Sequence, residues 1–350
     1  MRKWIALGLA ACMTVSSLTG CGSSKKEAET TAAESAAEST AQETGAETDA
    51  AESEAEKSEA AGSDLDKLVF TYVTSPLNVP TIIEKDQRIF EKDFGEMGIS
   101  TEYAEITSGA DQTQALASGD VQVLYAVGAT SVILSAANGA DIKVLNMYSR
   151  SPKAFCMYSK DESLTTPESL KGKTIAGPAG TNLHELLVSY LAQAGMSIDD
   201  VNYVSMSIPD AKAGLDGGSV DAALLAGSVA YNADKQGYHK VTDGEGLIKA
   251  IIAVATTQKF YDEHPEVIAQ LEKSQQEIAD FMKENPDETM SIVAKELDLD
   301  EEAVREMYDY YDFSLNISED DIDGFQKTAD FMLESGMIDE ALDVNSLFIK

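Results

Sequence analysis

The stretch Gln114-Ala115-Leu116-Ala117-Ser118-Gly119-Asp120-Val121-Gln122-Val123-Leu124 recurs in a similar form about 100 residues later. The second copy reads Ala213-Gly214-Leu215-Asp216-Gly217-Gly218-Ser219-Val220-Asp221-Ala222-Ala223-Leu224. Each copy combines the end of a helix, a glycine suited to a left-handed helix cap and a short buried strand. The repeated unit predicts two lobes of like topology.

Outward from these units, apolar strand-like runs alternate with helical patterns. Strands are predicted at 68–73, 100–106, 121–127, 142–148, 154–158, 173–176, 201–206, 220–225 and 250–255. The clearest helix has an apolar stripe at i, i+3, i+4, i+7, i+8 and i+11, formed by Leu183, Leu186, Leu187, Tyr190, Leu191 and Ala194. Beyond residue 257 the pattern is purely helical, with helices expected near 264–283, 286–297, 301–310 and 318–335. This alternation predicts an α/β architecture with largely parallel sheets.

The N-terminus predicts a lipoprotein signal peptide over residues 1–20. A short basic segment precedes an apolar run of about 13 residues, which is too short to cross a hydrocarbon core that needs about 20. The run ends in Leu18-Thr19-Gly20-Cys21, which resembles a bacterial lipobox. Acylation of Cys21 would anchor the chain stably, because two acyl chains hold where one does not. The alternative is an ordinary secretory signal with a chance cysteine.

Residues 21–66 are predicted to be a disordered acidic linker behind the lipidated cysteine. Between 22 and 66 there are 13 acidic and 3 basic side chains, and from 22 to 61 no Leu, Ile, Val, Met or aromatic residue. Such a segment cannot bury enough apolar surface to offset the entropy of ordering it.

Composition limits the remaining possibilities. From 67 to 350 there are 48 acidic and 21 basic side chains, so nucleic acid is not expected as a partner. Cys156 is the one cysteine left after the signal and the lipidation site, so no intrachain disulfide is expected, and an inert buried thiol is the favoured interpretation. No metal or other cofactor is expected, since the histidines do not cluster and no GxxxxGK[ST] loop is present.

Several further segments carry a resemblance to a known family. They are Pro76-Leu77-Asn78-Val79-Pro80, the 115–120 unit, Asn138 to Val144, Leu170 to Ala176, Gly177 to Thr181, His264 to Val267, and Glu284-Asn285-Pro286. In order and spacing the chain resembles the ABC-transporter binding proteins of the nitrate, taurine and aliphatic-sulfonate group, across nearly all of 67–350. It departs from them at Gln122, where the second unit has Asp221, and in having Trp4 as its one tryptophan. These departures put the ligand class in doubt rather than the fold.

The resemblance implies a two-lobed type II periplasmic-binding-protein fold, a Venus flytrap with C-terminal helices packed on lobe I. Lobe I would comprise 67–152 and 247–350, lobe II 153–246, and two hinge crossovers would lie near 150–154 and 245–250. It implies a monomeric receptor, not an enzyme, lipid-anchored on the extracytoplasmic face of a bacterial cell membrane. This receptor would capture a small organic anion such as a sulfonate or taurine and deliver it to membrane permease subunits.

Ligands of open α/β sheets lie beyond the carboxyl ends of the strands, where helix N-termini expose N–H groups suited to oxyanions. This rule selects loops containing Ser75, Leu77, Asn78, Ser108, Gly109, Gly128, Thr130, Ser131, Gly180, Thr181 and Asn182. Leu77, Val79 and Tyr125 are expected to supply an apolar wall. His184, Arg150, Ser228 and Tyr231 are further candidates; for His184 a plain surface position, and for Arg150 a surface salt bridge, remain open.

Other functions stay open at this point. The same receptor could take a neutral heterocycle such as a thiamine pyrimidine precursor, or could be a sensory lipoprotein that signals to another partner. An enzyme on the same scaffold is disfavoured by the lipobox and by the lack of an evident nucleophile–base pair.

Overall fold

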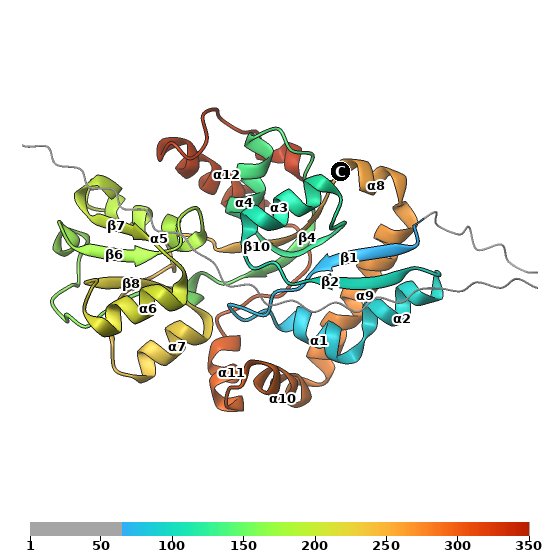
Figure 1. The fold of residues 1–350 in the computed structure, drawn as a ribbon, viewed down its shortest axis with the longest axis horizontal. Helices are drawn as coiled ribbons and strands as arrows, with labels where there is room; N and C mark the ends of the chain where they lie inside the picture. The colour runs from blue at the N-terminus through green and yellow to red at the C-terminus, as the bar shows by residue number, and fades with distance from the viewer. Residues whose placement is uncertain (1–64, 350) are drawn as a thin grey trace, which may run out of the picture. The chain divides into compact units, whose positions relative to one another are not determined.

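The computed structural model describes residues 65–349 (Figure 1). The predictions of a signal peptide, of lipidation at Cys21 and of the acidic linker fall almost entirely outside this range. The described strands are β1 Lys67–Thr71, β2 Ser100–Ala104, β3 Leu124–Gly128, β4 Lys143–Arg150, β5 Phe155–Ser159, β6 Thr174–Gly177, β7 Asn202–Ser205, β8 Ala222–Ala226, β9 His239–Asp243 and β10 Ile251–Thr256. The described helices are α1 Val79–Gln87, α2 Ile89–Glu96, α3 Gly109–Ser118, α4 Ala129–Ala137, α5 Asn182–Ala192, α6 Ile208–Gly217, α7 Gly227–Lys235, α8 Gln258–Glu263, α9 Pro265–Glu284, α10 Pro286–Leu297, α11 Glu301–Tyr308 and α12 Glu319–Glu334.

The first group of strands, here called sheet I, has the order β2-β1-β3-β10-β4. Strand β1 pairs with β2 in parallel, and β10 lies antiparallel between β3 and β4. A parallel bridge between Phe70 and Val123 joins the two parts.

The second group, sheet II, repeats this arrangement with the order β7-β6-β8-β5-β9. Strand β6 is parallel to β7 and β8, whereas β5 is antiparallel to both of its neighbours. The expectation of largely parallel sheets is therefore wrong for the strands next to β5 and β10. The chain enters each of these two strands from the other sheet, so β5 and β10 run antiparallel to the strands beside them.

The repeated sequence unit has the predicted structure in both sheets. Gly119 ends α3 and Gly218 ends α6, each with a left-handed backbone at φ 83° and 72°, and each is followed by the central strand of its sheet. Only a residue without Cβ adopts this conformation without strain, so the two glycines fix the turn from helix to strand.

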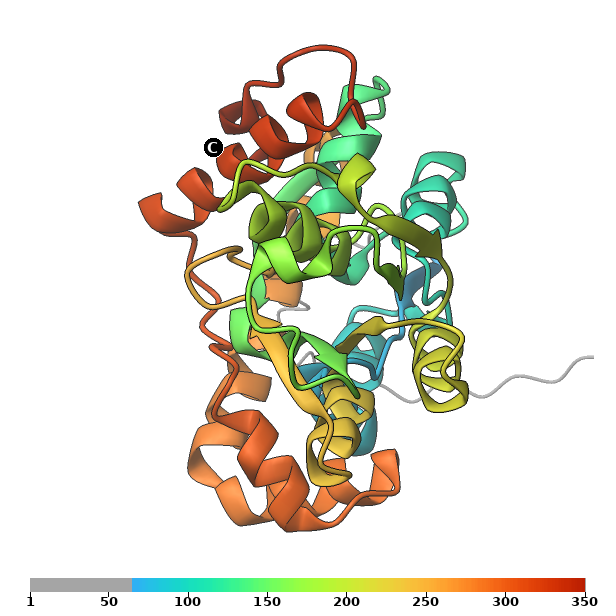
Figure 2. The same ribbon diagram turned by 90° about the vertical axis from the view of Figure 1, so that its left-hand side faces the viewer.

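Helices cover both faces of both sheets, which explains the near-continuous apolar strands. On sheet I, α1, α2, α9, α10 and α11 share one hydrophobic core, and α4 and α12 share another. Figures 1 and 2 both show α12 (red) on the opposite side of sheet I from α9 to α11 (orange). On sheet II, α5 packs on one face and α6 and α7 on the other. In β5, Phe155 and Met157 face α5 while Cys156 and Tyr158 face α7, so both sides of the strand are buried.

Strand β9 is the one described strand that the sequence reading missed. Only Val241 of its five residues is buried, because β9 is an edge strand. The predicted helices are all present, and α9 follows the expected stripe with Val267, Ile268, Leu271 and Ile278 buried. Within residues 65–349 no helix is both long enough and apolar enough to span a membrane.

Candidate functional site

The loop after β1 brings Ser75, Leu77 and Asn78 to the carboxyl end of sheet I, but with unequal exposure. Ser75 is exposed, whereas Leu77 is fully buried in the core and Asn78 is 3 % exposed. The Asn78 amide donates to the Val73 and Ser75 carbonyls at 2.8 and 3.2 Å. Asn78 thus shapes the loop, and Leu77 packs beneath it. Val79 and Tyr125 are also buried, so the expected apolar wall is part of the core and not of a ligand surface.

The starts of α3 and α4 meet at the same edge. Ser108 caps α3 by accepting the Asp111 N–H at 3.4 Å. A Cβ built on Gly109 would lie 2.0 Å from the Ser131 hydroxyl oxygen, so Gly109 and Ser131 are in close contact. Thr130 is 2 % exposed, and Gly128 precedes it as the N-cap of α4, without a side-chain cap. The structure therefore brings these predicted residues together, with Ser131 more accessible than Thr130.

The start of α5 is built as the sequence suggests. Thr181 is the N-cap: its hydroxyl accepts the Leu183 N–H at 3.3 Å and donates to the Pro178 carbonyl at 2.9 Å. Gly180 takes the left-handed backbone at φ 69°, and Asn182 is buried. The N-termini of α3, α4 and α5 share free N–H groups and a partial positive charge.

His184 is not a plain surface residue, because its ring is half-buried and its Nδ1 accepts a hydrogen bond within the chain. Its Nδ1 accepts the Gly180 N–H at 3.3 Å, and its ring stacks on Tyr203 with centroids 4.9 Å apart. Burial lowers the pKa of His184, which keeps the imidazole neutral. Its role in this structure is to hold the turn that precedes α5.

Arg150 is fully used within the chain. Its Nε and Nη2 donate to the two carboxylate oxygens of Asp321, each at 2.7 Å. The other N–H groups donate to the Ser314 and Asn316 carbonyls and to the Ser314 hydroxyl. Since a guanidinium has five N–H donors, none is left for a ligand. The salt-bridge alternative is the one the structure supports, and Arg150 fastens the segment before α12 to the end of β4.

The two sheets approach each other at the start of α7. Gly227 has a left-handed backbone at φ 56°, and a Cβ built there would lie 2.2 Å from the Pro76 carbonyl oxygen in the loop after β1. Ser228 follows Gly227 and is partly exposed. The carboxyl ends of β1 and β8 are thus brought into contact.

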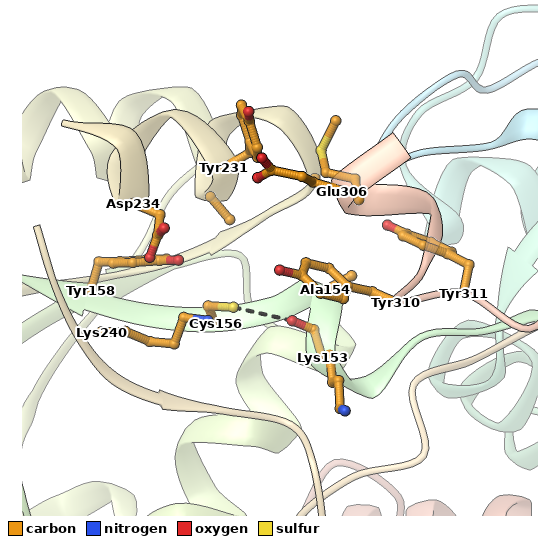
Figure 3. A pocket seen from close by; sticks show the side chains of 13 residues that line it. Lys153, Ala154, Cys156, Tyr158, Tyr231, Asp234, Lys240, Glu306, Tyr310 and Tyr311 are labelled. Atoms are coloured by element: carbon orange, nitrogen blue, oxygen red, sulfur yellow. Dashed lines mark hydrogen bonds between the residues drawn. The ribbon is translucent and has the colours of Figure 1, made fainter. Parts of the chain in front are cut away.

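Gly227 also borders a pocket (Figure 3). One side of the pocket is formed by β5, α7 and β9, and the other by α11 and the two residues Tyr310 and Tyr311 behind it. Cys156 lies in its floor, where its thiol donates to the Lys153 carbonyl at 3.4 Å. Burial raises the pKa of the Cys156 thiol to about 12, so it is an inert group, in line with the expectation.

The sequence reading named Tyr231 as a ligand candidate and Cys156 as an inert thiol, but none of the other residues around this pocket. Tyr158, Asp234, Tyr310 and Tyr311 come from three separate segments, and no motif links them.

Glu185, in the first turn of α5, was also missed: it is 4 % exposed, and its Oε1 accepts a hydrogen bond from Thr328 of α12 at 2.9 Å. Only the tertiary fold brings these side chains together.

The chain forms two α/β sheets of the same strand order, and each sheet contains one antiparallel strand that the chain enters from the other sheet. The two sheets meet through loops at their strand ends. This arrangement is the fold class of the periplasmic binding proteins. The chain belongs to the NMT1/THI5 like family, whose model matches residues 93–289.

Named relatives agree with this placement. A Bacillus subtilis (strain 168) protein provisionally named as an aliphatic sulfonates-binding protein is 28% identical over 274 residues, covering 77% of this chain and 82% of its own length. The taurine-binding periplasmic protein of Escherichia coli (strain K12) is 27% identical, covering 55% of this chain and 60% of that protein. The alkanesulfonate-binding protein SsuA from Xanthomonas axonopodis pv. citri, solved with MOPS, shares the fold with a TM-score of 0.73 at 21% identity, covering 81% of this chain and 98% of that one. The chain is accordingly a solute-binding protein and not an enzyme.

Proposed function

We propose that this protein is the extracytoplasmic receptor of an ABC importer and captures a small organic anion of the sulfonate or taurine type. The observation that carries the proposal is the contact between Gly227 and Pro76. It joins the loop after β1 to the start of α7, so a ligand bound beside this contact would touch both sheets at once. Binding energy from both sides would favour the arrangement in which the sheets are together.

The two sheets are proposed to be lobes that move about a hinge. Lobe I comprises 67–152 and 247–350, and lobe II comprises 153–246. The chain crosses between sheets twice, from β4 to β5 and from β9 to β10. Two short crossovers permit a hinge closure, in which a few residues at the ends of elements absorb the change in backbone angles.

The charge of the ligand is proposed from the helix starts. Helices α3, α4 and α5 begin beyond strand ends, with the hydroxyls of Ser108, Ser131 and Thr181 at their starts. Such ends favour oxyanions of the ligand. The names of the relatives, which include sulfonates and taurine, support the same class.

Delivery to permease subunits and anchoring through Cys21 complete the proposal. Both rest on the resemblance to importer receptors and on the lipobox sequence. The protein would work as a monomer on the outer face of the cell membrane.

A pair of variants at the α5 N-cap tests the anion site. Asp and Asn both cap helices well, so Thr181→Asp and Thr181→Asn should keep α5 intact. Only Asp adds a negative charge beside the proposed anion. We expect Thr181→Asp to weaken sulfonate binding at least tenfold by calorimetry, and Thr181→Asn to weaken it much less. Equal affinities of the two variants would remove the anion from this helix end.

The cargo itself is found by a thermal-shift screen of the purified protein with alkyl and aryl sulfonates, taurine, nitrate, bicarbonate and a pyrimidine. A ligand present at about 100 times its Kd should stabilise the folded state by about 2.7 kcal/mol, which raises Tm by a few degrees. A rise with the pyrimidine alone would contradict the anion proposal while leaving the receptor role in place.

A further inference from the structure

The pocket beside Gly227 has an aromatic lining that the proposed anion site does not use. Four tyrosines contribute to it, namely Tyr158 from β5, Tyr231 from α7, and Tyr310 and Tyr311 behind α11. The Tyr311 hydroxyl is buried and forms no hydrogen bond of good geometry within residues 65–349, although the Ser151 hydroxyl lies near it. A buried hydroxyl without a partner is destabilising, so a bound molecule that hydrogen-bonds to it gains from that contact.

Three of the four charged side chains that line the pocket form ion pairs. Lys153 pairs with Glu245 at 3.1 Å, and in Figure 3 its ammonium points away from the other side chains. Lys240 lies 3.9 Å from Asp243, and Glu306 lies 2.9 Å from Lys235.

Asp234 also lines the pocket, and its carboxylate has no ion pair or hydrogen bond within residues 65–349. Figure 3 shows this carboxylate beside the Tyr158 ring. Of the four charged residues that line the pocket, Asp234 is therefore the one without an ion pair within residues 65–349.

The chain itself already binds an ammonium group at the rim of this pocket. The Lys235 ammonium lies 2.9 Å from Glu306 Oε2 and 5.1 Å from the centre of the Tyr231 ring. A cation between a carboxylate and the face of an aromatic ring is attracted by both. Asp234 and Tyr158 offer the same pair of groups without an ammonium between them.

We propose that this pocket binds a small organic cation, with its ammonium group held by Asp234 against the Tyr158 ring. The body of the cation lies among the rings of Tyr231 and Tyr310, and the Tyr311 hydroxyl accepts a hydrogen bond from its N–H. The site adjoins the proposed anion site at Gly227 but has a different lining and binds the opposite charge. Because its walls come from 153–240 and from 306–311, a bound cation also holds these two parts together.

The proposal is tested by ligand-observed NMR titration of the purified protein with ethylammonium and tetramethylammonium. Neutral tert-butanol and anionic methanesulfonate serve as comparison probes. We expect both cations to bind at least tenfold more tightly than tert-butanol, and ethylammonium to be the tighter of the two because it alone can donate to Tyr311. Cation binding should weaken as salt is added.

Asp234→Asn keeps the shape of the side chain and removes its charge, and as an exposed residue it should not disturb folding. It is expected to weaken ethylammonium binding at least tenfold. The matched control is Glu263→Gln on α8, which changes the net charge equally but lies outside the pocket, and should stay within twofold of the parent.

Cation binding no tighter than that of tert-butanol, or an unchanged affinity in Asp234→Asn, would overturn the proposal. So would methanesulfonate binding that Lys240→Met abolishes, because the pocket would then be an anion site. Thr181→Asp should leave cation binding unchanged, so failure of this site and failure of the proposed anion receptor can be told apart.

Discussion

Glu185 is the residue whose surroundings depart furthest from what a carboxylate requires. It lies between α5 and α12, with one oxygen bonded to Thr328 and the other buried without a partner. Burial raises its pKa from 4.5 to about 7. Between these values the folded state keeps a proton that the unfolded state has released, so stability falls as pH rises from 4.5 to 7 and stays lower above that.

Glu185→Gln should therefore be more stable than the parent at pH 8 and equal to it near pH 4.5. The gain at pH 8 is about 1–3 kcal/mol, since one pKa unit corresponds to about 1.4 kcal/mol. Urea unfolding at both pH values measures it. Glu84, also buried with a pKa raised to about 7, is present in both proteins and cancels in the difference. A difference that does not change with pH would show that Glu185 is not protonated in the folded state.

Gln122 and Asp221 show how a residue that looked informative about the ligand has a structural role. The Gln122 side chain accepts the Val69 N–H of β1 at 2.9 Å, and Asp221 accepts the Thr174 N–H of β6 at 2.8 Å. Each ties the repeated unit to the neighbouring strand of its own sheet. The difference between them therefore says nothing about the cargo.

Gln122→Ala should destabilise the fold by about 1–2 kcal/mol, because it leaves the partly buried Val69 N–H without a partner. Asp221→Ala should cost less, since the Thr174 N–H is exposed and water can replace the carboxylate. Urea midpoints of the two variants measure the order, and ligand affinity should be unchanged in both. A larger loss for Asp221→Ala would mean that its contact with Lys173, at 3.8 Å, matters more than the backbone bond.

Among elements, the contact between the β1–α1 loop and α7 is the one that a single methyl group should break. A Cβ at Gly227 would meet the Pro76 carbonyl oxygen at 2.2 Å. Gly237 has the same left-handed backbone, at φ 79°, but its Cβ would meet nothing within 4 Å. The two glycines separate the effect of crowding from the effect of backbone strain, which costs about 1–3 kcal/mol at such angles.

We expect Gly227→Ala to weaken binding of the cargo at least tenfold, because the loop and the helix can no longer close on it. Gly237→Ala should lose comparable stability and keep its affinity. Calorimetry for affinity and urea unfolding for stability give the two readouts. Retained affinity in Gly227→Ala would show that the contact is not needed for binding.

Elements with a strong local signal could be predicted from the sequence, and elements defined by tertiary contact could not. The stripe from Leu183 to Leu191 and the glycine caps at Gly119 and Gly218 are local patterns and are confirmed, whereas Ala194, the last predicted member of the stripe, lies beyond the end of α5. Strand β9 exposes most of its residues and resembles a loop in sequence. The direction of β5 and β10 depends on where the chain enters each sheet, which no local pattern encodes.

For the whole molecule, the repeated unit predicted two lobes of like topology and the family resemblance implied the fold, but neither showed which strand-end residues are accessible. Leu77 and Thr130 stand in the predicted loops yet point into the core. Arg150 stands at a predicted crossover yet is bound by a segment more than 160 residues away. Burial and pairing of this kind follow from packing between distant segments, so the loops could be located while their exposed residues could not.

Net charge is the property of the whole molecule that most exceeds the ordinary range. The chain has a formal charge of −35 at pH 7. Most of its ion pairs are exposed, such as Lys67–Glu102 at 3.0 Å, and pairs of this kind contribute about 0–1 kcal/mol each. Repulsion among the excess carboxylates should outweigh them and destabilise the compact state.

Sodium chloride should therefore stabilise this protein against urea. Raising the salt from 0.1 to 1 M shortens the screening length from about 10 Å to about 3 Å, which weakens repulsion between exposed carboxylates, whereas the partly buried Arg150–Asp321 pair is screened less. We expect the urea midpoint to rise with sodium chloride at pH 7. Near pH 4.2, the isoelectric point of the sequence, the rise should vanish because the net charge does. A midpoint that falls with salt at pH 7 would mean that the exposed ion pairs, and not the repulsion, dominate the electrostatic contribution to stability.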